Sequence, residues 1–503
     1  MIVGVGQYSE RPDDTDYRAL SPMDLAGRAL AAAIGDCRES GDVAAAIDTV
    51  AAIRQFEIST PVARAPFGKS DNPPRSIAAR VGADPERAIL EVVGGQGPQK
   101  LVGELAADIA AGDCGMAAIV GSEAISTALT LAGRGEAPDW SEKVGGQLDD
   151  RGYGMKGLLD ASLIAHGLAA PIPIYALFEN ARRAEKGLSL DQYRRAMGEL
   201  FAPFSEIAAG NPHAAAPIAR SAEELAAVTE RNRIVAEPYP RMTVARDQVN
   251  QAAAILIASA GKARRLGVPE ERWVHIHGVA GATEASVLER ADLATSPASI
   301  ASVRAALDSA GIGIADIRYF DLYSCFAIAV FNIIDAFAIE PDDPRGLTLT
   351  GGLPFFGGAG NNYSSHAIAE AVQRLRGDPQ SYALIGANGG FMSKYATGIL
   401  SARPADWSDG SRWRTLANAE ASVAVEAGYT GEATIESYTI IPGIPGRSGD
   451  HGAVVARTPA GHRCVANPAD QATLGRLSES RSFGRRILVS PDESNKNTFS
   501  FAE

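Results

Sequence analysis

Three side chains that could perform nucleophilic or acid-base chemistry follow one strand-like segment and the loop after it. Tyr323 and Cys325 come directly after the strand-like segment 317–322, and His366 stands just before the helical pattern 367–376. A thiol beside an imidazole can form a nucleophile and base pair, and a tyrosine can act as an acid or base. If the three lie within hydrogen-bond reach they form one site; otherwise Cys325 is a small thiol packed in an apolar run.

The loop between these residues, 350–366, contains five glycines and runs straight into the helical pattern. Glycines at a strand-to-helix turn let the backbone approach a ligand closely, and the helix N-terminus behind them attracts negative charge. Asn361, Asn362 and, further along, Asn388 could donate to a carbonyl or orient water. Asparagine also tolerates the left-handed backbone of turns, which is the alternative explanation for Asn361 and Asn362.

The sequence gives little indication of a metal site or a disulfide framework. His275 and His277 alternate on a strand-like segment and so face the same side, but no nearby carboxylate or cysteine completes a ligand set. The four cysteines are scattered without paired spacing. We therefore expect no metal and a structural role for the two histidines.

Composition limits the class of protein. A chain of 503 residues with 46% hydrophobic residues predicts two to four domains. A formal net charge of −13 argues against a general nucleic-acid surface. The N-terminus reads as a first strand rather than a targeting signal, and no segment reaches the roughly 18 apolar residues of a membrane span. These features predict a cytoplasmic protein.

The pattern along the chain predicts an α/β architecture in four parts. Strand and helix alternate over residues 1–124, helical stretches dominate an inserted region at 125–240, and strand and helix alternate again over 241–403. Residues 410–503 contain short β-prone runs separated by Gly, Pro and Asp, which suggests a small β-barrel. The β-prone runs are 421–425, 433–442, 452–457 and 486–489.

These segments together resemble the thiolase superfamily, especially the sterol-carrier-protein-type thiolases and the thiolase-like proteins. The Tyr-Ser-Cys-Phe run 323–326 stands where the family has His-Asp-Cys-Phe, and the Gly-Gly-Ala turn 357–359 stands at its Gly-His-Pro turn. The run 249–254 resembles the strand entry of the second thiolase half. The resemblance implies two similar βαβ halves with an inserted, mainly helical loop domain. The tail resembles an added C-terminal domain, for which we expect a barrel of oligonucleotide-binding type.

The same resemblance implies that the usual catalytic groups are missing. The nucleophilic cysteine falls at Gly94 or Gly95, the second cysteine falls in the turn 387–389, and the histidine falls at Gly358. Standard thiolysis through a covalent acyl-enzyme is therefore not expected. Backbone N–H groups of the glycine turns could still bind a thioester oxygen. The candidates for this contact are Gly94, Gly95, Gly357, Gly358 and Gly389.

Three functions follow as alternatives. The resemblance implies an acyl-CoA-handling protein, an acetyl-CoA acetyltransferase by family, with CoA or acyl-CoA as ligand and no further cofactor. The second alternative is an aldolase-type carbon–carbon lyase on a CoA ester that uses Tyr323 and His366. The third is a non-catalytic acyl-CoA or partner-binding protein. In thiolases the inserted region covers the pantetheine arm, so Asn211-Pro212-His213 either covers substrate or forms a capped turn. Family members pair through the edge of the first half, so a homodimer is the default expectation, although an added domain could block that edge.

Overall fold

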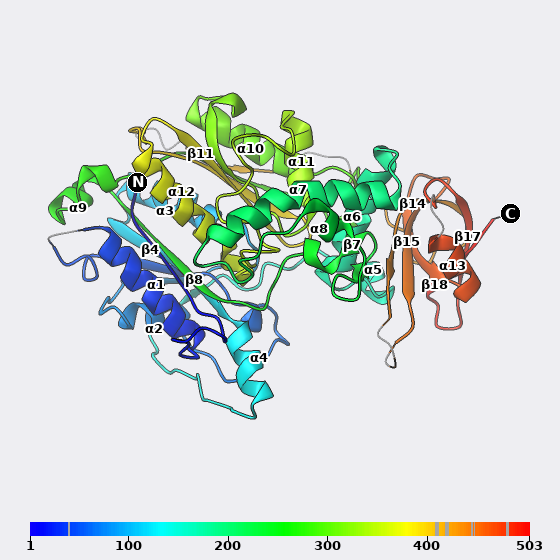
Figure 1. Ribbon diagram of the computed structural model, residues 1–503, viewed down its shortest axis with the longest axis horizontal. Coiled ribbons are helices and arrows are strands. Elements are labelled where there is room, and N and C mark those ends of the chain that lie inside the picture. The colour runs from blue at the N-terminus through cyan, green and yellow to red at the C-terminus, as the bar shows by residue number, and fades with distance from the viewer. Residues whose placement is uncertain are drawn as a thin grey trace.

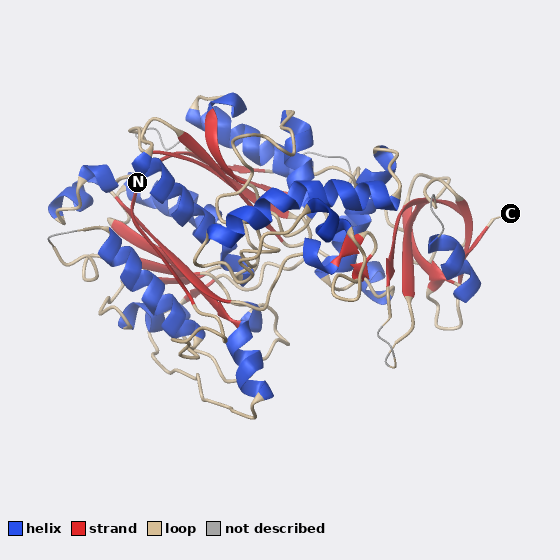
Figure 2. Ribbon diagram, viewed as in Figure 1, coloured by secondary structure: helices blue, strands red, loops and turns tan. Residues whose placement is uncertain are grey.

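The computed structural model describes residues 1–38, 41–407, 412–417, 422–443, 446, 448–478 and 482–502. In this part of the chain, two β-sheets are each covered by helices on the outside and separated by helices on the inside (Figure 1, Figure 2). A separate barrel lies at one end of the molecule, with the C-terminus (Figure 1).

The first sheet has six strands in the order β1-β8-β4-β2-β3-β5. It is mixed, because β8 runs antiparallel to both of its neighbours while β4, β2, β3 and β5 run parallel. The expected strand 252–258, placed by its sequence in the second half, is β8 and lies inside this first sheet. Every residue of β8 is buried, so the strand needs a neighbour on each side and helices on both faces. The strands are β1 (Ile2–Ser9), β2 (Thr49–Ala52), β3 (Arg87–Leu90), β4 (Met116–Ala124), β5 (Asp149–Asp150) and β8 (Asn250–Ala258).

The second sheet has the strand order β10-β11-β12-β9-β13 and is also mixed, because β12 runs antiparallel to β11 and β9. Strand β12 directly follows β11 and pairs with it as a hairpin, so the end of β11 lies beside the start of β12. The strands are β9 (His275–Thr283), β10 (Ile317–Asp321), β11 (Tyr382–Gly389), β12 (Lys394–Ser401) and β13 (Trp413–Leu416).

Helices α3 (Gly97–Ala111) and α12 (Tyr363–Gly377) form the layer between the two sheets, and each contacts strands of both. Outside the first sheet lie α1 (Pro22–Asp36) and α2 (Pro73–Ala79); outside the second lie α10 (Pro297–Ala310) and α11 (Ala327–Phe337). Helix α1 begins as its sequence predicts: the Ser21 side chain accepts a hydrogen bond from the Asp24 N–H, and Pro22 occupies the first turn. The remaining short helices of this part are α4 (Ile125–Gly133), α9 (Ala260–Arg265), η1 (Phe56–Ile58), η3 (Glu270–Arg272), η4 (Val287–Glu289), η5 (Ile314–Asp316) and η6 (Gly360–Asn362).

The region between β5 and β8 is mainly helical, as the strand-poor sequence predicts. Its longest helix, α7, begins with a capping box in which Ser189 and Gln192 each accept from the other's backbone N–H. A two-stranded sheet of β6 and β7 and the turn η2 lead back to the first sheet. The elements are α5 (Ala161–Ala165), α6 (Pro171–Glu185), α7 (Leu190–Gly210), α8 (Ala222–Ala226), β6 (Ile234–Ala236), β7 (Tyr239–Pro240) and η2 (Arg241–Thr243).

The C-terminal residues form a closed five-stranded barrel in the order β14-β15-β16-β18-β17. Three strands match expected runs; β16 and β18 have no counterpart among them. Of the run 421–425, residue 421 lies outside the described residues and Val425 forms an isolated bridge. The elements are β14 (Gly431–Ile441), β15 (His451–Arg457), β16 (Arg463–Pro468), α13 (Gln471–Ser478), β17 (Arg486–Pro491) and β18 (Asn497–Phe501).

The barrel is fixed to the rest of the chain by buried polar contacts. The Ser437 hydroxyl donates to the Leu177 carbonyl at 2.6 Å, and the Asn180 amide donates to the Tyr438 carbonyl at 2.9 Å. The fully buried Arg463 guanidinium donates to the carbonyls of Leu288 and Arg290. These groups would be left unpaired if the barrel moved away. The barrel and the part of the chain that contains the two sheets therefore form one packed unit.

Among the described residues, no helix is both long enough and apolar enough to cross a membrane.

Candidate functional site

The turn before α3, where the resemblance puts the nucleophile, is packed directly against the end of β11. A Cβ added to Gly389 would lie 1.9 Å from Oε1 of Gln96 and 2.9 Å from the Gly95 nitrogen. A Cβ added to Gly94, whose φ is +133°, would lie 2.1 Å from the same Oε1. The Gln96 side chain, only 4% exposed, therefore fills the space between the two turns.

Tyr323 fills the other side of this turn. A Cβ on Gly95 would lie 2.2 Å from the Tyr323 hydroxyl and 2.5 Å from the Asn388 carbonyl oxygen. The Tyr323 ring packs edge-on against Tyr363, with centroids 5.4 Å apart. Burial raises the pKa of Tyr323 well above its ordinary value, so the hydroxyl stays protonated and is a poor base.

Cys325 and Asn388 meet at the end of β11, together with Tyr175 of α6. The Asn388 amide donates to the Tyr175 hydroxyl at 3.1 Å and points at the Cys325 sulfur at 3.6 Å. Burial raises the pKa of the Cys325 thiol to about 12, so no thiolate forms at neutral pH. A cavity of about 20 Å³, bordered by Tyr323, Asn388 and Tyr395, is large enough for about one water molecule and not for an acyl group.

His366 lies elsewhere, in the first turn of α12 against β1. Its Nδ1 is 2.7 Å from Oε1 of Gln7, and its ring packs against Phe356 at 5.0 Å. Burial lowers its pKa well below the ordinary value, so the imidazole is neutral. In the described part of the chain the hydrogen-bond partner of the His366 side chain is therefore Gln7 and not Cys325.

Two of the backbone N–H groups considered for a thioester oxygen already donate hydrogen bonds within the protein. The Gly94 N–H donates to Oδ1 of Asn361 at 2.9 Å, and the Gly358 N–H donates to the Arg246 carbonyl at 2.7 Å. The Asn361 amide in turn donates to the Arg54 carbonyl at 2.6 Å, while the Asn362 amide donates to the Gly121 carbonyl at 2.8 Å. The two asparagines thus anchor the glycine loop to the first sheet.

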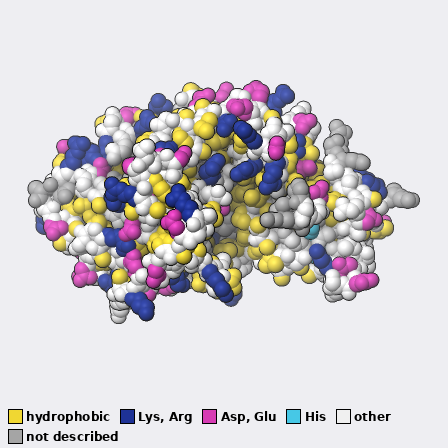
Figure 3. All heavy atoms as spheres, turned by 60° about the horizontal axis from the view of Figure 1, so that its bottom comes forward, with side chains coloured by type: hydrophobic (Ala, Val, Ile, Leu, Met, Phe, Trp, Pro, Cys, Tyr) yellow, Lys and Arg dark blue, Asp and Glu magenta, His cyan; other side chains and the backbone are white. Residues whose placement is uncertain are grey.

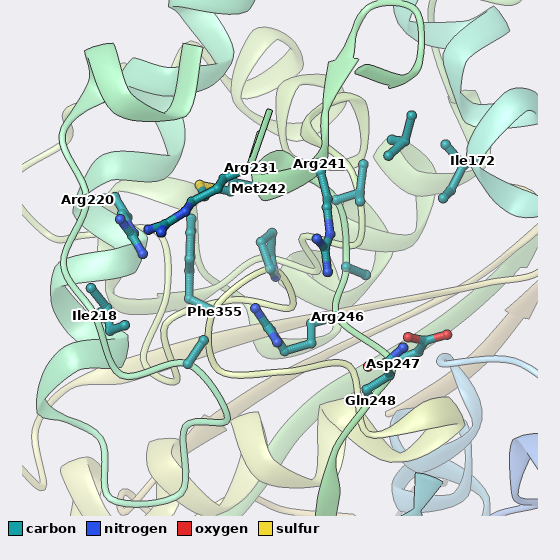
Figure 4. A pocket seen from close by; sticks show the side chains of 15 residues that line it. Ile172, Ile218, Arg220, Arg231, Arg241, Met242, Arg246, Asp247, Gln248 and Phe355 are labelled. Atoms are coloured by element: carbon teal, nitrogen blue, oxygen red, sulfur yellow. The ribbon is translucent and has the colours of Figure 1, made fainter. Parts of the chain in front are cut away.

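A cleft of about 470 Å³ opens beside the glycine loop, with Phe355 on its wall (Figure 4). Four arginines line it: Arg220, Arg231, Arg241 and Arg246. Figure 4 shows their guanidinium groups directed toward the space between the inserted region and the glycine loop. Figure 3 shows a hollow in one face of the molecule with Lys and Arg side chains beside it.

Most of this positive charge is not neutralised. Arg220 pairs with Glu224 at 3.3 Å. The guanidinium groups of Arg231, Arg241 and Arg246 make no ion pair or hydrogen bond within the described residues, and all three residues are exposed. Desolvation, and secondly the charge of Arg241, lowers the pKa of Arg246. One acid, Asp247, also lines the cleft. The cleft therefore suits an anionic ligand.

Sequence reasoning missed three residues that lie around the turn before α3 and the end of β11, namely Gln96, Tyr175 and Lys394. The Lys394 ammonium donates to the Val93 carbonyl at 2.9 Å, and desolvation lowers its pKa to about 8. The arginines of the cleft are spread over residues 220–246, with no motif that a linear pattern reveals. Only their shared cleft identifies them.

His275 and His277 lie on β9, away from these groups. Desolvation lowers the pKa of His275 to about 4, and Nε2 of His277 lies 2.9 Å from the Arg403 carbonyl oxygen. In the part of the chain that the structure describes, neither belongs to a group of three or more side chains that could hold a metal.

Comparisons with known proteins agree with this architecture. A family profile described as the thiolase-like protein type 1 additional C-terminal domain matches residues 415–494. The structure of a monomeric SCP2-thiolase-like protein type 1 from Mycobacterium smegmatis is 44% identical, with a TM-score of 0.83 over 100% of this chain and 98% of that one. Among curated protein sequences, none matches this chain.

More distant structures share the fold over 80% of the chain. The Ltp2-ChsH2(DUF35) aldolase is 18% identical, covered over 97% of its length, with a TM-score of 0.55. An acetyl-CoA acetyltransferase from Syntrophomonas wolfei is 15% identical, covered over 98% of its length, with a TM-score of 0.56. The expected thiolase fold with a C-terminal five-stranded barrel is thus confirmed, and the chain belongs to the thiolase-like protein type 1 family, related to the SCP2 thiolases.

Proposed function

We propose that this protein binds CoA thioesters in the arginine-lined cleft and does not carry out cysteine-dependent thiolysis. The observation that carries the proposal is the set of three guanidinium groups, on Arg231, Arg241 and Arg246, that line one cleft without a carboxylate partner in the described residues. Guanidinium groups bind phosphate oxygens through paired, charge-assisted hydrogen bonds. CoA carries three phosphate groups, so it matches a cluster of this charge.

The rest of the cleft wall fits the less polar parts of such a ligand. Ile172, Val235 and Met242 are half-buried and offer apolar surface to the ligand. The cleft also adjoins the glycine loop, the segment that carries the family resemblance.

The packing of the centre supports the absence of thiolysis. Gln96 and Tyr323 occupy the positions that a side chain at Gly94, Gly95 or Gly389 would need. All four cysteines are buried. Cys325, the cysteine among the candidate site residues, keeps its proton at neutral pH. A thiolase needs an accessible thiolate, and this centre offers neither the thiolate nor space for the acyl group.

The lyase alternative has less support. Its proposed base Tyr323 has a raised pKa. Its second candidate, His366, forms a hydrogen bond with Gln7 of β1. The likeness to the Ltp2-ChsH2(DUF35) aldolase is a likeness of fold at 18% identity. We therefore favour ligand binding over carbon–carbon bond cleavage at the family's usual centre.

We also propose that the chain is monomeric rather than dimeric. The edge strand β3 is covered by the chain's own β5, through the pairs Ile89–Asp149 and Leu90–Asp150. The Arg151 N–H continues this pairing with the Leu90 carbonyl at 3.1 Å. The sheet then ends in β5, which is only two residues long, and so short an edge strand offers few backbone groups to a second copy. The relative from Mycobacterium smegmatis is likewise described as monomeric.

Calorimetric titration with CoA, acetyl-CoA and pantetheine tests the binding proposal. We expect CoA and acetyl-CoA to bind and pantetheine, which lacks the phosphates of the nucleotide, to bind far more weakly. Acetoacetyl-CoA with free CoA should give no acetyl-CoA above background. Equal binding of pantetheine and CoA would refute the role of the arginines, and steady thiolysis would refute the inactive centre.

A further inference from the structure

A serine and a histidine meet in a second cleft that the centre described above does not use. The Ser9 hydroxyl oxygen lies 3.0 Å from Nδ1 of His213, although 204 residues separate them in the sequence. Both line a cleft of about 590 Å³, and both are half-buried, so their side chains are open to it.

The fold fixes this pair through strand pairing. Ser9 is the last residue of β1 and stands opposite Gln251 of β8. The Gln251 amide donates to the His213 carbonyl at 2.8 Å, and the His213 N–H donates to Oδ1 of Asn211 at 2.9 Å. Both backbone groups of His213 are thus held, and its ring is positioned over the end of β1. Of the two uses considered for Asn211-Pro212-His213, the capped turn is present, and it presents the imidazole to the cleft.

The surroundings favour the neutral form of the His213 imidazole, and a neutral imidazole has a free nitrogen that can accept a proton. Burial, and to a smaller extent the charge of Arg11, lowers the pKa of His213. A neutral ring with the proton on Nε2 accepts the Ser9 hydroxyl proton at Nδ1. Three acids line the same wall: Glu10 accepts from the Arg18 and Leu20 N–H groups, Asp14 pairs with Arg11, and Asp13 is exposed to solvent.

The second cleft shares part of its wall with the arginine-lined cleft. Ala216, Ile218, Arg246 and Gln248 line both. A ligand that places its phosphates among the arginines can therefore extend past Arg246 toward Ser9. Arg246 brings positive charge to the junction, where a carbonyl oxygen would become negative during nucleophilic attack.

We propose that Ser9 and His213 form a nucleophile and base pair that hydrolyses a thioester carried by a phosphate-bearing group such as CoA. The inference rests on the proposed function for the phosphate-binding end of the ligand. It assigns chemistry to a place other than the turn before α3, where the family resemblance put it.

The reaction runs in two balanced steps. His213 Nδ1 takes the Ser9 proton while Oγ bonds to the thioester carbon; the carbon–sulfur bond then breaks, and the departing sulfur takes that proton. In the second step a water gives a proton to His213 and its oxygen bonds to the acyl carbon. The acyl–Oγ bond breaks, Oγ regains the proton, and a carboxylic acid leaves.

The test uses the full-length protein with acetyl-CoA and with p-nitrophenyl acetate, a phosphate-free ester. Release of CoA thiol and of p-nitrophenol is measured for the wild type, Ser9→Ala, His213→Gln and Ser309→Ala. Ser309 is a half-buried serine near the end of α10 that lines neither cleft, and its hydroxyl donates to the Ala305 carbonyl of the same helix, so Ser309→Ala is the matched control. We expect kcat/KM to fall at least about 100-fold in Ser9→Ala and His213→Gln for both substrates, and to stay unchanged in Ser309→Ala.

An Arg241→Ala variant separates this inference from the proposed function. We expect it to raise KM for acetyl-CoA while leaving p-nitrophenyl acetate hydrolysis unchanged. If the wild type binds acetyl-CoA but hydrolyses neither substrate, or if Ser9→Ala and His213→Gln remain fully active, the inference is overturned and the binding proposal stands. If p-nitrophenyl acetate hydrolysis depends on Ser9 and His213 but CoA does not bind, the catalytic pair stands and the proposed ligand fails. Trapping an acetyl group on the Ser9 peptide, detected by mass spectrometry in the wild type and absent from Ser9→Ala, would establish the covalent step directly.

Discussion

The Tyr323 hydroxyl stands where a side chain at Gly95 would begin, 2.2 Å from the position of an added Cβ. The second obstacle, the Asn388 carbonyl oxygen at 2.5 Å, belongs to the backbone of β11 and cannot turn aside. The glycine is therefore required by the close approach of the turn before α3 to the end of β11.

Restoring a cysteine at this turn should not restore thiolysis. Gly95→Cys should lower the free energy of unfolding by about 1–3 kcal/mol, because the new side chain overpacks the turn. Urea unfolding followed by circular dichroism measures this, with acetoacetyl-CoA cleavage as the activity readout. Gly35→Ala is the control: Gly35 lies in α1 with nothing within 4 Å of an added Cβ, so its replacement should stabilise by up to about 1 kcal/mol. A Gly95→Cys protein of native stability would show that the turn opens easily.

CoA affinity should depend on the arginine cleft and on ionic strength. Arg231→Ala and Arg241→Ala should each weaken CoA binding about tenfold, equivalent to about 1.4 kcal/mol, and make the affinity less sensitive to salt. Fluorescence or calorimetric titrations at two salt concentrations check both effects. Arg265→Ala removes an exposed arginine of α9, outside the cleft, and should leave binding unchanged. Salt-independent binding, or equal loss in all three variants, would contradict a specific phosphate site.

The covered edge of the first sheet should depend on Arg151, which bonds to Glu91 at 2.7 Å and also pairs with Glu104. The Glu91 side chain is fully buried and, within the described residues, would keep only Lys100 as an ion-pair partner. Arg151→Ala should therefore lower the free energy of unfolding by about 2 kcal/mol. Arg87→Ala breaks an exposed pair with Asp108 and should cost no more than about 1 kcal/mol.

Light scattering tests the edge that β5 covers in a second way, through the oligomeric state of the protein. We expect the wild type to have the mass of one chain, 52.4 kDa, and Arg151→Ala to self-associate as β5 detaches from β3. A dimeric wild type would show that the chain pairs through a surface other than the edge covered by β5.

The docking of the barrel should depend on Arg463. Its side chain is fully buried, pairs with Glu436 and donates to the carbonyls of Leu288 and Ala291 in and after η4. Arg463→Leu leaves these acceptors unpaired and should destabilise the protein by about 3 kcal/mol. In differential scanning calorimetry we expect the single transition to separate into two, with the barrel melting first. Arg457→Ala removes a 31% exposed partner of the same Glu436 and should cost less than about 1 kcal/mol. One unchanged cooperative transition in Arg463→Leu would mean that other contacts hold the barrel.

The protein should become less stable as the pH rises, because the buried Glu123 has a raised pKa. Desolvation raises its pKa well above the ordinary value, against a single backbone hydrogen bond from the Phe56 N–H at 2.9 Å. The folded state then binds more protons than the unfolded state, so its contribution is complete below the unfolded pKa. That contribution is lost as the pH rises toward the folded pKa.

Glu123→Gln keeps the acceptor for Phe56 and removes the carboxyl group that titrates, so it should raise Tm at neutral pH and flatten the decline of Tm from pH 5 to pH 8. Glu91→Gln is the matched comparison, because Glu91 is equally buried but pairs with Lys100 and Arg151, and its replacement should lower Tm. The same sign for both variants would contradict the distinction between an unpaired and a paired buried carboxylate.

Much of the fold follows from local sequence. The cap at Ser21 and the proline after it set the start of α1, and the runs 433–442, 452–457 and 486–489 correspond to β14, β15 and β17. Local patterns of this kind report on backbone preference and on which faces are apolar. They did not reveal β16, which contains the buried Arg463, or β5, which consists of two aspartates, because these strands are selected by partners distant in the sequence.

The sequence by itself determined which side chains are absent: glycine at 94 and 95 excludes acylation at those two positions whatever the fold. Only the tertiary structure decided what stands there instead, namely Gln96 and Tyr323, and only it joined Ser9 to His213 and gathered the arginines around one cleft. The physical reason is that a missing side chain is a property of one position. Contact between residues hundreds of positions apart depends instead on sheet order, register and helix packing, which no single segment encodes.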